Sequence, residues 1–160
     1  MQTSYLRLGA MILTSTFVMF GLMYLNTFAA NHIWFSQTRM WMAIYMGAAM
    51  AAVMLSFMFG MYRNSKLNIA IFAGAAVMFT GSLYMVRSQA TVDDEAWMKA
   101  MIPHHSIAIL TSSRASVSGP RVRKLADGII ETQRTEIAEM EALIADLNGG
   151  ATTTWEIDRR

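Results

Sequence analysis

Side chains that bind soft metal ions recur with helical spacing in the second half of the chain. Met98, Met101 and His105 follow one another at intervals of three and four residues, which places them on one face of a helix. His104 lies beside this line, and Pro103 removes a backbone hydrogen bond, so a kink is expected to turn His104 inward. Thioether sulfur and imidazole nitrogen both bind metals, so this face is a candidate metal site.

A carboxylate interrupts an apolar stripe further along the chain. The stripe lies in a predicted helix over residues 120–147 and consists of Val122, Leu125, Ile129, Met140, Leu143 and Leu147. Gln133 and Glu136 fall within it. Because burying an isolated charge is costly, we expect Glu136 to pair with a cation. If the two helices pack antiparallel, Glu136, Gln133 and Met140 face the donors of the first helix.

The donor types favour copper. Thioether and imidazole ligands suit Cu(I), whereas Mg²⁺ and Ca²⁺ need mainly oxygen ligands. Ag(I) is a soft ion of the same charge and is expected to substitute for Cu(I). The sequence contains no Glu-x-x-His pair, which argues against a di-iron carboxylate site.

The same residues are also compatible with roles that need no metal. Methionine fills gaps in apolar cores, so Met98, Met101 and Met140 taken singly are each typical of core residues. Adjacent histidines are often exposed or capping groups. Glu136 could equally pair with Arg134 or with a neighbouring chain.

The first half of the chain has the composition of a membrane domain. Residues 1–88 carry five basic residues and no acidic one. Three apolar stretches, at about 5–25, 40–61 and 67–86, approach the roughly 20 residues that a helix needs to cross a bilayer. We therefore predict three transmembrane helices, with Ser65 as the N-cap of the third.

Basic residues set the predicted orientation, because they are retained preferentially on the cytoplasmic side of a membrane. Arg7, Arg63 and Lys66 would lie inside together with the amino terminus. Residues 89–160 would then lie outside the cytoplasm. A competing interpretation takes residues 1–30 as a cleaved signal peptide, which leaves two helices to cross the bilayer.

The second half predicts a soluble helical hairpin. Acidic residues 93–95 place negative charge at a helix N-terminus, where the helix dipole favours it. That helix is predicted to continue to about Ser116. Gly119 belongs to the break, and Pro120 opens a second helix that extends to about Leu147.

The chain therefore divides into a membrane domain over 1–88, an extracytoplasmic helical domain over 89–148 and an irregular tail over 149–160. Basic residues of the second half cluster only at 121–124, so nucleic-acid binding is not expected. Two helices rarely stabilise a core without a disulfide, a metal or a partner, and the chain has no cysteine. We expect a homodimer whose two hairpins form a four-helix bundle.

Two motifs resemble those of the domain of unknown function 305 family. They are Met-Ile-Pro-His-His at 101–105 and the series Gln133, Glu136, Ile137 and Met140. The resemblance implies a ferritin-like helical bundle that binds copper or silver in the bacterial periplasm. The ligand candidates it implies are Met98, Met101, His104, His105 and Met140. Many relatives have Met at or near the position of Leu110, so this chain departs from the family pattern there.

Five methionines recur every four residues in the second predicted transmembrane helix. They are Met42, Met46, Met50, Met54 and Met58. A soft-ion relay is one interpretation of this stripe. Helix packing beside Gly47 is favoured, because no charged residue accompanies the sulfur atoms to mark an ion path.

These observations predict an all-α protein of the bacterial inner membrane, with three transmembrane helices followed by a ferritin-like hairpin. Its expected function is to bind Cu(I), with Ag(I) as a substitute, in metal sequestration, trafficking or tolerance. The predicted ligands are His104, His105, Met98, Met101, Met140 and Glu136. A copper transporter or a periplasmic metal carrier is the expected partner, and no enzymatic activity is expected. The alternatives are a copper-dependent oxidase and a structural or assembly subunit without metal.

Overall fold

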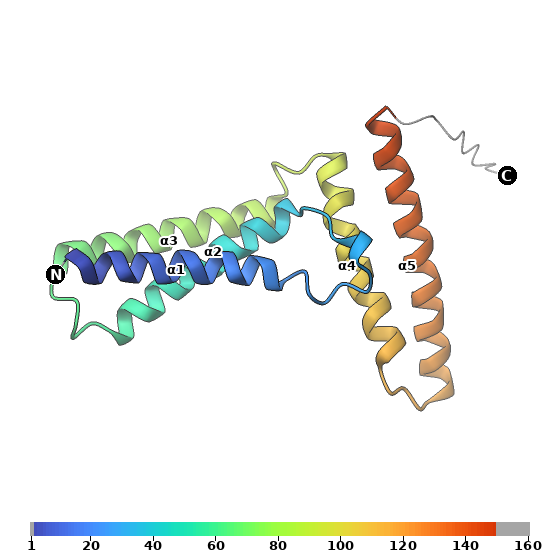
Figure 1. The fold of residues 1–160 in the computed structure, drawn as a ribbon, viewed down its shortest axis with the longest axis horizontal. Coiled ribbons are helices and arrows are strands. Elements are labelled where there is room, and N and C mark those ends of the chain that lie inside the picture. Colours follow the sequence, from blue (N-terminus) through green and yellow to red (C-terminus); the bar gives the residue numbers. More distant parts are fainter. Residues whose placement is uncertain (1, 150–160) are drawn as a thin grey trace. The chain divides into compact units, whose positions relative to one another are not determined.

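The computed structural model describes residues 2–149, and the regular elements there are all helices (Figure 1). In chain order they are α1 (Gln2–Leu22), the 3-10 helix η1 (Ala30–His32), α2 (Gln37–Phe57), α3 (Ser65–Ser88), α4 (Asp94–Arg114) and α5 (Pro120–Leu147). The predicted all-α class is confirmed for this part of the chain. The predicted tail lies outside the described residues from residue 150 onward.

The described residues form two compact units. A three-helix unit contains the residues up to Asn26 and residues 36–92, and a hairpin unit contains residues 27–35 and the residues from Asp93 onward. The boundary predicted at residue 88 assigned 27–35 to the membrane domain. The structure instead groups this segment with α4 and α5.

Each helix of the three-helix unit is long and apolar enough to cross a membrane. The most apolar windows have a mean hydropathy of 1.5 in α1, 1.7 in α2 and 1.9 in α3. By length and composition they agree with the three predicted transmembrane helices. The helix α2 packs against both α1 and α3. A Cβ atom at Gly47 would collide with Oγ1 of Thr16, so glycine permits the close approach of α1 and α2 there.

Capping residues decide where α2 and α3 begin. Ser36 Oγ accepts the backbone N–H of Arg39 at 3.2 Å, so α2 begins before the predicted residue 40. Asn64 Oδ1 accepts the N–H of Leu67 at 3.2 Å. Asn64 is therefore the N-cap of α3, and the prediction of Ser65 was wrong because the asparagine one position earlier supplies the acceptor.

A buried cluster lies at the end of α2. It consists of Leu8, Leu55 and Tyr62. Met54 and Met58 pack against this cluster, as the packing interpretation of the methionine stripe expects. Burial of Tyr62 turns the chain back toward α1, so α2 ends at Phe57 and not at the predicted residue 61.

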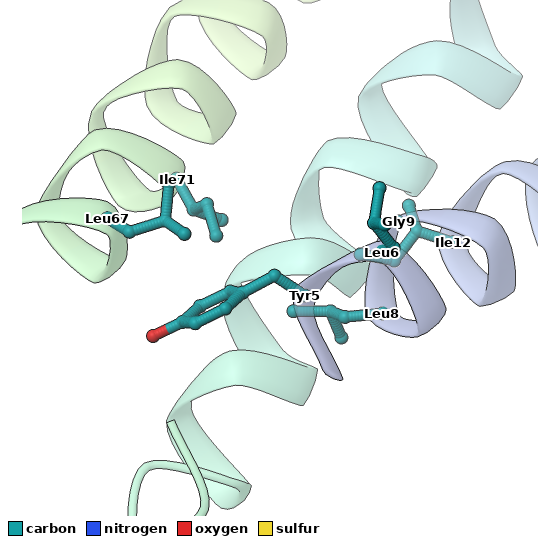
Figure 2. A pocket seen from close by; sticks show the side chains of 7 residues that line it. All are labelled: Tyr5, Leu6, Leu8, Gly9, Ile12, Leu67 and Ile71. Atoms are coloured by element: carbon teal, nitrogen blue, oxygen red, sulfur yellow. The ribbon is translucent and has the colours of Figure 1, made fainter. Parts of the chain in front are cut away.

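An apolar groove of about 580 Å³ lies between α1 and α3 (Figure 2). Its lining consists of Tyr5, Leu6, Leu8, Gly9, Ile12, Leu67 and Ile71. The Tyr5 hydroxyl donates to Asn68 Oδ1 at 2.8 Å and accepts the N–H of Asn64 at 3.2 Å, which joins the start of α1 to the start of α3. Its lining carries no charged side chain, so this groove is not a candidate metal site.

In the hairpin unit, α4 and α5 lie side by side in antiparallel orientation (Figure 1). Their buried seam consists of Met98, Ile102 and Ile109 from α4 and Ile137, Met140 and Ile144 from α5. Asp93 Oδ1 accepts the N–H of Ala96 at 2.8 Å and caps α4. Pro120 lies in the first turn of α5, where its missing N–H costs no helical hydrogen bond.

Glu95 connects the beginning of α4 to the end of α5. One carboxylate oxygen lies 2.6 Å from Lys99 Nζ and accepts Nδ2–H of Asn148 at 3.2 Å. These hydrogen bonds, that from Lys99 first, lower the pKa of Glu95. Because solvent screens the pair, the contact orients the two helix ends more than it stabilises them.

The apolar stripe predicted for the second helix is mostly exposed in the single chain. Of its six residues only Met140 is buried in the seam. The row that faces α4 is the neighbouring one, which consists of Ala126, Ile130, Gln133, Ile137, Met140 and Ile144. Both rows repeat every three to four residues, so periodicity does not distinguish them. The helix α5 therefore has two adjacent apolar faces.

The segment 27–35 packs on α4. The N–H of Phe28 donates to Ser106 Oγ at 2.7 Å, and His32 Nδ1 lies 2.9 Å from the same oxygen. Trp34 packs against the seam, with Lys99 Nζ 5.6 Å from its ring centroid. This side chain therefore belongs to the hairpin unit.

We expect Ser106→Ala to release the segment 27–35 from α4. The substitution leaves the N–H of Phe28 without its acceptor, which costs about 1–3 kcal/mol. Amide hydrogen exchange over this segment in the full chain should become about tenfold faster or more. Ser113→Ala is the matched control, because the Ser113 hydroxyl bonds only the Leu110 carbonyl of its own helix. Equal exchange rates in the two variants would contradict the assignment.

Candidate metal centre

An imidazole and a carboxylate meet across the seam between α4 and α5. His105 Nε2 lies 2.9 Å from Glu136 Oε2. Gln133 Nε2–H donates to the same carboxylate oxygen at 3.1 Å. The side chain of His105 is 12% exposed and that of Glu136 44% exposed, so the pair lies at the edge of the seam. The carboxylate predicted to pair with a cation therefore lies against the imidazole of His105, which is charged only when it is protonated.

The second ring nitrogen of His105 is also engaged. His105 Nδ1 lies 3.0 Å from the carbonyl oxygen of Met101, one turn earlier in α4. A carbonyl oxygen can only accept, so we assign a proton to Nδ1. This hydrogen bond fixes the ring orientation and directs Nε2 toward Glu136.

The contact between His105 Nε2 and Glu136 limits what can lie between these two atoms. An ionised carboxylate also only accepts, so the contact with Glu136 requires either a proton on Nε2 or a cation in its place. Histidines that bind metals usually donate their other ring N–H to a carbonyl or carboxylate oxygen. His105 has this arrangement, with the Met101 carbonyl as the outer acceptor.

Methionines flank this pair on both helices. Met98 is 5% exposed and Met140 7% exposed, and both belong to the buried seam, against which the partly buried Met101 packs. Met101 precedes His105 by one helical turn, and Met140 follows Glu136 by one turn. The thioethers therefore lie on the turns next to the imidazole and the carboxylate.

His104 does not join this group. The helix α4 continues through Pro103 without a break, and His104 is exposed. Its ring centroid lies 6.2 Å from that of His105, with the rings nearly perpendicular. The expectation that Pro103 would turn His104 inward was wrong, because the helix accommodates the proline without reorienting the next residue.

One chain brings few metal ligands together. Within the described residues, no three histidine, aspartate or glutamate side chains lie close enough together to hold a metal ion. The seam supplies one imidazole and one carboxylate, so further ligands would be thioethers, amide oxygens or groups from outside the chain. An imidazole with a single carboxylate does not supply the mainly oxygen ligands that Mg²⁺ and Ca²⁺ need.

The structure adds three residues to the surroundings of the candidate centre. Ser106, the neighbour of His105, is fully buried and contacts His32 and Phe28. These contacts hold the turn of α4 that carries His105. No spacing in the sequence indicated them, since the segment 27–35 is distant along the chain.

Residues 77–154 match the family model described as "Domain of unknown function (DUF305)". The match supports the assignment of this part of the chain to that domain family. It covers all of α4 and α5, and with them the contact between His105 and Glu136. The description attaches no activity to the family.

The chain is also similar to a viral protein. Over 65 residues it is 43% identical to "Uncharacterized protein L153" of Acanthamoeba polyphaga mimivirus. The alignment covers 39% of this chain and 42% of the relative, so the chain spans less than half the length of that protein. No solved structure matches the chain.

We expect the contact between His105 and Glu136 to contribute modestly to folding without metal. A double-mutant cycle of His105→Ala and Glu136→Ala should give a coupling energy of about 0.2–1 kcal/mol, because the carboxylate is partly exposed. The measurement is chemical unfolding of the full chain in detergent with a chelator. A cycle of His105→Ala with Glu139→Ala is the control and should show no coupling. Equal coupling in both cycles would argue against a specific pair.

Proposed function

We propose that this protein is a membrane-anchored copper- or silver-binding protein that holds the monovalent ion on the periplasmic side of the bacterial inner membrane. The observation that carries the proposal is the contact between His105 and Glu136, with Met101 and Met140 on the adjacent turns. Imidazole and thioether ligands from two helices match the preferences of Cu(I) and Ag(I).

In this proposal the chain's residues have distinct tasks. His105 Nε2 binds the ion, and its Nδ1–H stays bonded to the Met101 carbonyl and keeps the ring in place. Glu136 balances the positive charge, and Gln133 orients that carboxylate. Met98, Met101, Met140 and His104 remain candidate ligands, of which His104 would have to reach from its exposed position.

Anchoring explains how such a site would act. The three apolar helices would keep the hairpin unit beside the bilayer. Ion exchange with a copper transporter or a soluble periplasmic carrier would then occur at the membrane surface. Sequestration, trafficking and metal tolerance are all consistent with that position. No catalytic step is part of the proposal.

We expect Met101→Leu and His105→Gln each to weaken Ag(I) binding by about tenfold or more, because even the loss of an outer partner of a metal ligand costs about 10–100-fold. Competition titrations of the full chain in detergent with Ag(I), Cu(I) and Zn(II) measure this. Met78→Leu on α3 is the matched control, since Met78 is exposed in the three-helix unit. Preference for Zn(II) over both monovalent ions, or unchanged binding in all variants, would overturn the proposal.

A separate experiment tests on which side of the membrane the hairpin unit lies. The chain contains no cysteine, so a single introduced cysteine reports accessibility without background. In intact cells, Ser118→Cys should react with a membrane-impermeant maleimide, whereas Ser65→Cys should react only after permeabilisation. Both positions are exposed in the structure. The reverse labelling pattern would place the hairpin unit in the cytoplasm.

A further inference from the structure

The second apolar face of α5 is open in the single chain. It consists of Val122, Leu125, Ile129, Leu143 and Leu147, all of them exposed. Leu125 is 64% exposed and Leu147 61% exposed, although both lie in a 28-residue helix whose other apolar face is buried. Several exposed apolar side chains along one face of a helix are typical of an interaction site.

A polar interruption lies at the centre of this face. Glu136 occupies the same row, between Ile129 and Leu143. The midpoint of the row from Val122 to Leu147 falls within two residues of Glu136. If two such rows pair antiparallel about a two-fold axis, each carboxylate lies near the axis, and the apolar ends cover one another.

Charge along α5 favours the same pairing. The first half of the helix, 120–134, carries four basic and two acidic residues, whereas the second half, 135–147, carries four acidic residues and no basic one. In an antiparallel pair, the basic half of one helix lies beside the acidic half of the other. A parallel pair would juxtapose like charges. The face is therefore complementary to itself, which identifies its occupant as a second copy of this chain.

Pairing through this face would double the number of metal ligands at the candidate centre. One chain brings one imidazole and one carboxylate together, and no third histidine, aspartate or glutamate side chain completes a site within the described residues. Two copies paired through this face would bring two His105 and two Glu136 side chains to the axis. The two imidazoles, with the thioethers on the adjacent turns, would form a ligand set that suits Cu(I) or Ag(I), and the two carboxylates would balance its charge.

We infer that the metal site is shared: two chains pack antiparallel through the second face of α5, and His105 and Glu136 of both copies surround one ion at the two-fold axis. This inference rests on the proposed function and specifies that both chains supply the metal ligands. The thioethers of Met101 and Met140 then line the ends of the shared site. The four helices form the bundle that a single hairpin lacks.

Native mass spectrometry of the full chain in detergent with Ag(I) tests the sharing. Wild type should be a dimer with one Ag(I) per two chains. Leu125→Lys combined with Leu143→Lys should give monomers and weaken Ag(I) binding at least tenfold. Ala138→Lys combined with Ala145→Lys is the matched control and should keep the dimer and the ion, because both alanines are exposed on the other side of α5.

Disulfide trapping tests the relative orientation of the two α5 helices without introducing charged side chains. A mixture of Leu125→Cys chains and Leu143→Cys chains should cross-link under a mild oxidant, and either variant alone should not. The two positions are about 27 Å apart along one helix, so in an antiparallel pair Leu125 of one chain lies beside Leu143 of the other, and two copies of the same cysteine are too far apart to bond. Efficient cross-linking of the Leu125→Cys variant with itself would indicate parallel pairing and overturn the inference.

The outcomes separate the inference from the proposed function. One Ag(I) per chain, bound equally well by wild type and by the Leu125→Lys and Leu143→Lys variant, would leave the metal-binding function intact and refute sharing. A wild-type dimer that binds no Ag(I) or Cu(I) would refute both the function and the shared site. The wild-type stoichiometry decides even if the lysine variant does not fold.

Discussion

The candidate metal centre depends on a carboxylate at the edge of an apolar seam. Glu136 lies in a helix that is apolar on two faces, and at 44% exposure its carboxylate stays partly in contact with solvent while His105 and Gln133 both contact Oε2. His105 is in turn oriented by the Met101 carbonyl. This chain of contacts connects the backbone of α4 to the side chains of α5, and every chemical property proposed for the protein follows from it.

The connection between α1 and α2 adds a constraint on this chain of contacts. It crosses from the three-helix unit to the hairpin unit and back, and Ser106 of α4 holds it through Phe28 and His32. Since Ser106 adjoins His105, the residues that link the two apolar helices also contact the turn of α4 that carries the candidate metal centre. The two units are thus joined by three covalent crossings of the chain and not by the single linker that the sequence suggested.

The sequence predicted the elements of the fold well where the signals are local. Asp93 and Pro120 begin α4 and α5 as capping preferences require, and α5 ends at Leu147 as predicted. Hydropathy located the three apolar helices, although its windows displaced the ends of α2. Caps depend on single side chains, and a hydropathy average cannot distinguish Asn64 from Ser65 as the acceptor.

The candidate site was predictable only in part. The pairing of Glu136 with a group on α4 followed from the cost of burying a charge, but the partner among His104 and His105 depended on whether Pro103 bends the helix. The choice of Arg134 as an alternative partner was equally compatible with spacing. Only the packed hairpin resolves these choices, because they depend on which face of each helix meets the other.

Composition and local pattern were sufficient to establish an all-helical chain with three apolar helices before a polar hairpin, since hydropathy and turn residues act over a few neighbouring positions. Tertiary structure alone decided which of two apolar rows of α5 is buried, and it alone joined Phe28 to Ser106, 78 positions further along the chain. Both outcomes depend on contacts between distant segments. Periodicity within one helix carries no information about them.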